Sequence, residues 1–190
     1  MATNRKQVLK RLLSLTLIVV LCLQLFPFPA QASSEAVLTN GMPVTEENVL
    51  ALIEEYRNGK EPGQKAKDAG FTSYVHGATY DAYNPKYRIV LPSGTKNGIE
   101  CAKFAYAFFD DIFGSDVPIR EVTDPADVRP GDLIQLPGHW AIVTMAAFDY
   151  EGKGPHTQTI DGGASGSIGW STDGYVNLSA AKNIYTKYPD

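Results

Sequence analysis

Residues 100–114 read ECAKFAYAFFDDIFG, and residues 130–146 read PGDLIQLPGHWAIVTMA. In the first stretch, apolar residues follow Cys101 at offsets of 3, 4, 7, 8 and 11, which is one face of a helix that Gly114 can end. In the second stretch, a Pro-Gly-Asp turn signal at residues 130–132 leads into a strand at 133–136. A Pro-Gly break then precedes a strand from His139 to about residue 146. A helix followed by a run of strands predicts an α+β fold with an antiparallel sheet.

The flanking sequence adds elements on both sides. Residues 43–58 are expected to form a helix that Thr45 caps and that Gly59 follows. Further strands are expected at residues 87–91, 157–161, 175–178 and 184–188. The tyrosines between Tyr74 and Tyr87 are expected to pack in the interior rather than to line a cleft.

The N-terminus has the pattern of a secretory signal. A basic segment with Arg5, Lys6, Lys10 and Arg11 precedes an apolar stretch at residues 12–26, and Ala30-Gln31-Ala32 is a small-x-small cleavage site. The stretch is short for a membrane span, which favours a cleaved signal. An uncleaved N-terminal anchor is the alternative interpretation. We therefore expect a signal peptide at 1–32, a leader and helix at 33–66, a catalytic domain at 67–190, and a secreted or cell-wall-associated protein.

Charge narrows the possible partners. The chain carries 17 Lys and Arg against 21 Asp and Glu, and the signal segment holds four of the cations and none of the anions. Its removal would change the formal charge from −4 to −8. An acidic chain without a Lys/Arg run has no electrostatic case for binding nucleic acid. No segment after the signal is apolar enough to predict a transmembrane span.

The number of cysteines points to chemistry. The chain has two, Cys22 and Cys101, and Cys22 would leave with the signal. A single remaining thiol in a secreted protein cannot form an internal disulfide, which favours a reactive group or an intermolecular bridge. It also excludes thiolate-rich zinc sites, and no cofactor is predicted.

Cys101 and His139 have the features of a nucleophile and its base. A thiol in the first turn of a helix lies at the positive end of the dipole, which favours thiolate, and a nearby imidazole strengthens this preference. His139 begins a strand after a turn, and Asp161, at the end of a later strand, is the candidate that orients its ring. The competing interpretations are a packed core cysteine, a structural histidine, a turn-forming Asp161, and His156 as the orienting residue.

Three segments in this order resemble a known family. Residues 100–106 look like the nucleophile helix of the CHAP and NlpC branch of papain-like cysteine hydrolases. Residues 128–134 with 138–143 resemble that branch's turn, strand and His-initiated strand, and residues 159–163 resemble its next strand. Three positions depart from the CHAP pattern: Glu100 replaces an aromatic residue or Gln, Asp161 replaces Glu, and Gly163 replaces Asn.

The resemblance implies a small papain-like fold with N-terminal helices packed on an antiparallel sheet. It implies Cys101 as nucleophile, His139 as base, Asp161 in the third role, and backbone N–H groups near Cys101 as the oxyanion site. The expected activity is cleavage of amide bonds in bacterial peptidoglycan peptides. The alternatives are a papain-like hydrolase of another secreted substrate and a non-catalytic extracellular binding module.

Overall fold

The computed structural model describes residues 36–163, 165–170 and 174–189. The predicted signal peptide, residues 1–32, lies outside these residues. The described part contains helices and antiparallel sheets, so the predicted α+β class is confirmed. Residues from Ala36 onward form one compact unit. None of the helices in this described part is both long and apolar enough to span a membrane.

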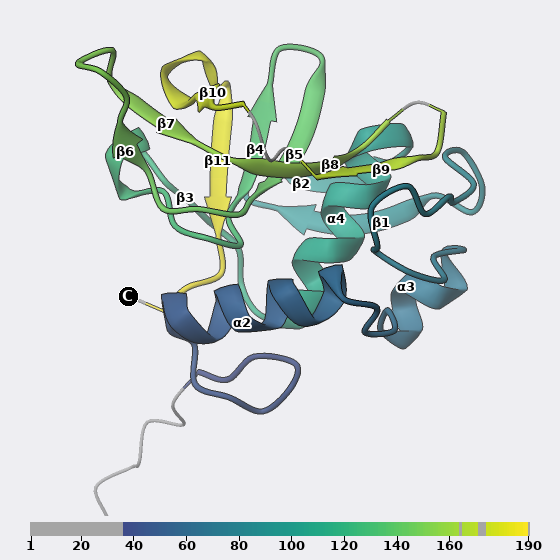
Figure 1. Cartoon of the computed structure of the whole chain (residues 1–190). Helices are drawn as coiled ribbons and strands as arrows, with labels where there is room; N and C mark the ends of the chain where they lie inside the picture. Colours follow the sequence, from purple (N-terminus) through teal and green to yellow (C-terminus); the bar gives the residue numbers. More distant parts are fainter. Residues whose placement is uncertain (1–35, 164, 171–173, 190) are drawn as a thin grey trace, which may run out of the picture. The chain divides into compact units, whose positions relative to one another are not determined.

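A six-stranded antiparallel sheet forms the largest layer (Figure 1). Its strands, in spatial order, are β3 (Arg120–Glu121), β11 (Asn183–Thr186), β4 (Leu133–Leu136), β5 (His139–Val143), β8 (Thr159–Gly162) and β9 (Ile168–Trp170). The C-terminal strand β11 lies between β3 and β4, and the hairpin of β4 and β5 forms the centre. Both strands that were expected to carry functional residues, β5 and β8, are therefore neighbours in the middle of this sheet.

Two smaller antiparallel sheets complete the strand structure. One is the hairpin of β1 (Tyr87–Leu91) and β2 (Gly94–Gly98). The other has the order β10 (Val176–Asn177), β7 (Pro155–Thr157) and β6 (Phe148–Asp149). Of two short 3₁₀ turns, η1 (Pro125–Asp127) lies between β3 and β4 of the main sheet, and η2 (Leu178–Ala180) links β10 to β11.

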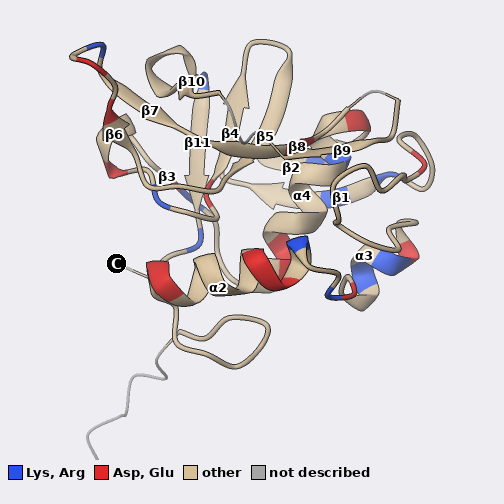
Figure 2. Ribbon diagram, in the orientation of Figure 1, with Lys and Arg blue, Asp and Glu red and all other residues tan. Residues whose placement is uncertain are grey.

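In the described part of the chain, three α-helices pack with these sheets. They are α2 (Glu46–Arg57), α3 (Gln64–Asp68) and α4 (Glu100–Phe113). The Thr45 side chain accepts a hydrogen bond from the Asn48 N–H at 3.2 Å, so the predicted cap of α2 is confirmed. Figure 2 shows acidic residues along α2 and charges of both signs on α3.

Helix α4 is the centre of the core. Every residue from Lys103 to Phe113 is buried, because α4 contacts β5 and β8 of the main sheet, the β1–β2 hairpin and both other helices. Aromatic rings fill the surrounding space: the Phe104 and Phe108 rings stack at 5.7 Å, and Tyr74 meets Phe108 edge-on at 4.7 Å. Tyr74, Tyr80 and Tyr87 are buried, as expected of the tyrosines in this region, but the expectation was wrong for Tyr83, which is exposed.

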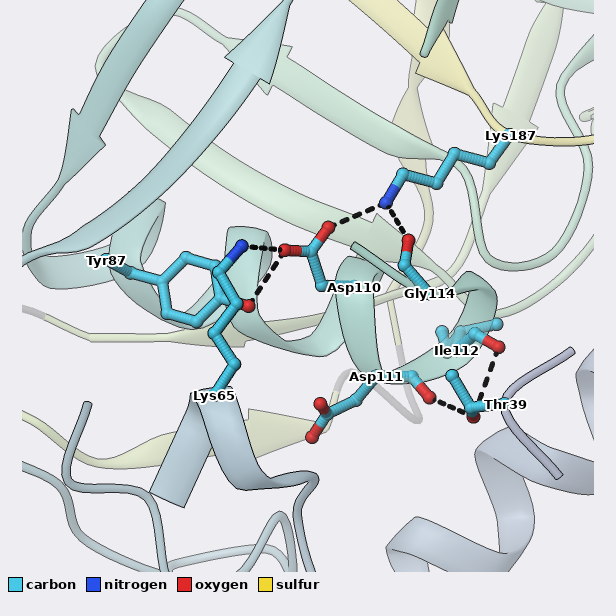
Figure 3. Close-up of polar contacts among 8 residues, drawn as sticks. All are labelled: Thr39, Lys65, Tyr87, Asp110, Asp111, Ile112, Gly114 and Lys187. Atoms are coloured by element: carbon cyan, nitrogen blue, oxygen red, sulfur yellow. Dashed lines mark hydrogen bonds and ion pairs between the residues drawn. The ribbon is translucent and has the colours of Figure 1, made fainter. Parts of the chain in front are cut away.

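The C-terminal end of α4 is held by a buried polar cluster (Figure 3). The Asp110 carboxylate lies 2.6 Å from the Lys187 ammonium and 2.6 Å from that of Lys65, and it accepts a hydrogen bond from the Tyr87 hydroxyl at 2.8 Å. The Asp110 and Lys187 side chains are 3 % and 0 % exposed. This cluster joins α4 to α3, β1 and the residue that follows β11, and so fixes the helix against elements distant in sequence.

Several predicted boundaries were wrong, and several short elements were missed. Strand β5 ends at Val143 rather than near residue 146. The expected strand at 157–161 is divided: Thr157 ends β7, and β8 begins at Thr159. The two parts pair with different strands: β7 pairs with β6 and β10 in the three-stranded sheet, whereas β8 pairs with β5 and β9 in the main sheet. The unpredicted elements are α3, β2, β3, β6, β9 and the two 3₁₀ turns, and only the last residue of β7 lay in a predicted strand.

Candidate active site

Cys101 lies in the first turn of α4 and is a half-buried free thiol. The residue before it, Glu100, has a φ of 53°, which is unusual for a side chain other than glycine. The Glu100 N–H donates to the Ala82 carbonyl at 2.7 Å, its carbonyl accepts from the Tyr80 hydroxyl at 3.0 Å, and its carboxylate accepts from the Tyr83 hydroxyl at 2.6 Å. These contacts offset a backbone strain that typically costs about 1–3 kcal/mol and fix the direction in which the helix begins.

His139 is the first residue of β5 and faces Asp161. It follows Gly138, whose φ of 73° forms the turn between β4 and β5. The His139 Nε2 and Asp161 Oδ2 atoms lie 2.9 Å apart. Ile142 pairs with Ile160 between β5 and β8, so continuing this register places Asp161 on the same side of the sheet as His139.

Two glycines allow this arrangement to close. A Cβ at Gly162 would lie 2.6 Å from the Phe104 Cβ and would also overlap the Tyr80 hydroxyl, so β8 approaches α4 more closely than any side chain allows. Gly169 on β9 pairs with Asp161 on β8, and a Cβ at Gly169 would lie 3.2 Å from Asp161 Oδ1. Glycine at these positions leaves room for the helix packing and for the carboxylate.

The environment of Cys101 favours the thiolate. Burial raises the pKa of the thiol, but hydrogen bonds from the His139 side chain and from the backbone N–H groups of Trp140 and Ala102 outweigh it. Together with the charge of His139, they leave the pKa below its ordinary value. At the start of α4, the Glu100 N–H donates to Ala82 and the Lys103 N–H to Ile99, which leaves those of Cys101 and Ala102 as donors to a negative charge at the sulfur or beside it.

His139 is correspondingly stabilised as an imidazolium. The hydrogen bond with Asp161 is the largest cause that raises the pKa of His139 to about 10; the contact with Cys101 adds to it, and burial opposes it. Since Nε2 faces Asp161, Nδ1 is the ring nitrogen left for the sulfur. A lowered thiol pKa and a raised imidazole pKa describe a thiolate–imidazolium pair, the reactive form of a Cys-His nucleophile.

The structure thus brings Cys101, His139 and Asp161 together and leaves the other histidines elsewhere. His156 lies in β7 of the three-stranded sheet, where its Nδ1 is 2.8 Å from the Gly154 carbonyl oxygen. The His76 Nδ1 accepts a hydrogen bond from the Trp170 N–H at 3.3 Å. Among the described residues, no group of three or more His, Cys, Asp or Glu side chains is placed to hold a metal ion.

Tyr80 is the residue at this site that the sequence did not indicate. It is 7 % exposed, and its hydroxyl holds the Glu100 carbonyl. Burial raises the pKa of Tyr80, and the charges of Cys101 and Asp161 raise it further, so the phenol remains a neutral donor beside the Cys101–His139 pair. Its position in a loop 21 residues before Cys101 has no pattern of its own, and only its place in a tyrosine-rich stretch distinguished it.

In comparisons with known proteins, no family model, no curated protein and no solved structure matches the chain.

Proposed function

We propose that this protein is a cysteine amidohydrolase that acts outside the cytoplasm on the peptides of bacterial peptidoglycan. The observation that carries the proposal is the chain of contacts from Cys101 through His139 to Asp161, with the thiol at the start of a buried helix. A structural cysteine does not need an imidazole partner that is itself fixed by a carboxylate. The predicted signal peptide supports the extracellular site of action.

The reaction follows from the roles of the three side chains. The Cys101 thiolate attacks the amide carbonyl, and first-turn N–H groups of α4 stabilise the negative charge on the carbonyl oxygen. The His139 imidazolium gives its proton to the leaving amine as the C–N bond breaks. Water, deprotonated by the now neutral imidazole, then attacks the acyl-enzyme and releases the acid and the thiolate. Asp161 keeps the ring oriented and stabilises its positive charge throughout.

The arrangement of a nucleophile helix against a sheet that carries the base and the orienting residue also supports a papain-like fold as the finer description. Helix α4 packs on β5 and β8, and the three residues come from the helix start and from two adjacent strands in this order. The same geometry weighs against a non-catalytic binding module, since such a module has no use for a thiolate–imidazolium pair.

The decisive experiment compares peptidoglycan digests. Purified peptidoglycan is incubated with the wild type, with Cys101→Ala and with His139→Ala, and soluble fragments with newly freed amines are identified by mass spectrometry. His76→Ala is the matched control, because His76 is exposed and lies outside the triad. Release of these fragments by the wild type and by His76→Ala, but not by Cys101→Ala or His139→Ala, supports the proposal. Equal release by Cys101→Ala excludes a cysteine mechanism, and no release by the wild type excludes this substrate.

A further inference from the structure

A cleft lies directly beside the nucleophile. Its volume is about 410 Å³, within the range of about 300–1,000 Å³ that is common for small-molecule sites. Ile99 and Ala102, which flank the Glu100–Cys101 pair, line it together with Trp140, whose backbone N–H bonds to the sulfur. Cys101 itself does not line the cleft, so a substrate held there would reach the thiolate by extending past Ala102 and Trp140.

The floor of the cleft is aromatic and fixed. The Trp140 ring meets Tyr106 edge-on at 5.1 Å and lies parallel to Tyr185 at 6.3 Å. Tyr106 and Tyr185 are 2 % and 4 % exposed, so they support the indole from below without filling the cleft. Such a surface packs against the flat face or the aliphatic part of a ligand without having to rearrange.

The lining of the cleft carries a positive charge. Among the described residues that line the cleft, Lys96 on β2 is the one charged side chain, and the amides of Asn97, Gln135 and Asn183 also line it. The Asn183 side-chain amide donates to the side-chain oxygen Oε1 of Gln135 at 2.6 Å, and this hydrogen bond orients both amides. The cleft thus has a lining cation and no lining carboxylate, in a chain whose formal charge is −4.

A second cavity shows the contrast. It has a volume of about 580 Å³, but Glu46, Glu121 and Asp127 line it alongside Arg120 and Arg129. Unlike the cleft, which Ala102 and Trp140 line, it is bordered by no residue next in sequence to Cys101, His139 or Asp161. Its mixed charges favour no single ligand charge, and its position offers no route to the sulfur.

We propose that the cleft beside Cys101 binds a part of the substrate that carries a free carboxylate, and that Lys96 selects for this carboxylate. The substrate class is then a peptide with a carboxylate close to the scissile amide, its apolar part resting on Trp140. This inference rests on the proposed function, because it takes Cys101 as the nucleophile.

The test uses two alkylating probes that differ only in charge: N-(iodoacetyl)glycine, a carboxylate, and N-(iodoacetyl)glycinamide, its neutral amide. In each, the Cys101 thiolate attacks the iodomethylene carbon, a sulfur–carbon bond forms and iodide leaves. The measured quantity is the ratio of the second-order rate constants, anionic over neutral, at low ionic strength. Lys96→Gln removes the charge, Lys96→Arg keeps it, and Lys86→Gln is the matched control, since Lys86 is also exposed but does not line the cleft.

We expect Lys96→Gln to lower the ratio about threefold, as removal of one exposed charge within several ångströms of a carboxylate should. The difference should shrink in high salt. Lys96→Arg and Lys86→Gln should keep the wild-type ratio. An unchanged ratio in Lys96→Gln, or an equal fall in Lys86→Gln, would overturn the assignment of Lys96.

The experiment separates the two proposals. The ratio reports on the cleft whether or not peptidoglycan is the substrate, so a negative digest leaves it interpretable. The absolute rates report on the nucleophile. If Cys101 reacts with both probes no faster than a simple thiol, the activated thiolate of the proposed function fails, and the ratio still decides the role of Lys96.

Discussion

Replacing Asp161 by asparagine should lower the pKa of His139 while leaving the ring in place. The Asp161 carboxylate oxygen lies 2.9 Å from His139 Nε2. An asparagine carbonyl can still accept the hydrogen bond from Nε2–H, but it carries no negative charge. The substitution therefore removes the electrostatic part of the interaction and keeps the part that orients the ring. Asp161→Ala removes both.

The size of the effect follows from the surroundings of the pair. Asp161 is the largest cause that raises the pKa of His139 to about 10, ahead of Cys101. An opposite charge at this distance shifts a pKa by about 1–3 units. The two side chains are 35 % and 36 % exposed, and solvent screens the charge of such a pair. We therefore expect a fall at the low end of that range, about one unit.

The measurement is a titration of the His139 ring by NMR. It is made in the Cys101→Ala background, so that the charge of the sulfur does not contribute, with and without Asp161→Asn. The chain has three histidines, and the other two serve as internal references in the same spectra. An unchanged pKa of His139 would refute the reasoning, because Asp161 would then not be the charge that holds the imidazolium. Turnover should also be lower in Asp161→Ala than in Asp161→Asn, since only alanine frees the ring to turn.

Four further outcomes are expected. The rate of wild-type turnover should rise with pH as the Cys101 thiol ionises, at a pH below its ordinary pKa. It should fall as the pH passes about 10, where His139 loses its proton. A pH profile that follows a simple thiol would contradict the ion pair. Gly162→Ala should destabilise the fold by about 1–3 kcal/mol in urea unfolding, because the added methyl overlaps Phe104. Asp110→Asn should cost about 3 kcal/mol in the same assay, because it leaves a buried ammonium without its counter-charge. Burial raises the pKa of Asp132 from 3.8 to about 7, so the folded state holds a proton that the unfolded state releases above pH 3.8. The free energy of unfolding should therefore fall as the pH rises towards 7, and Asp132→Asn should remove this dependence in urea unfolding.

The parts of the fold that were predictable are those with a clear hydrophobic period. Helix α4 repeats apolar residues over three turns, and its structure runs from Glu100 to Phe113 as the sequence indicated. Strand β4 also has its predicted bounds, because a turn and a Pro-Gly break enclose it. Local sequence alone was enough for these elements.

The missed elements depend on partners that the local sequence does not reveal. Strand β2 reads GTKNG, four of whose five residues are exposed, and it is extended because β1 pairs with it along its whole length. Helix α3 has five residues and no side-chain cap, and Lys65 ties it to Asp110 of α4. Tertiary pairing overrides weak propensity in both cases.

The candidate site was more predictable in its residues than in its geometry. The place of Cys101 at a helix start and of His139 at a strand start follows from patterns that the sequence shows directly. The positive φ of Glu100, the hydroxyl of Tyr80 that holds its carbonyl, and the orientation of Asp161 towards Nε2 are set by contacts between segments far apart in the chain. No periodicity encodes such contacts.

The distribution of glycine explains how three separate elements can meet at one sulfur. Catalytic groups must be positioned within about 0.5 Å to be effective, and rigid elements achieve this better than loops. Here the rigidity comes from direct contact between the β8 backbone at Gly162 and the side of α4, where a methyl group would already overlap Phe104. The distance between helix and strand is thereby fixed by the van der Waals surfaces of the two elements, and Asp161, one residue before Gly162, has little freedom to move away from His139. The fold thus positions the orienting carboxylate through the absence of a side chain next to it.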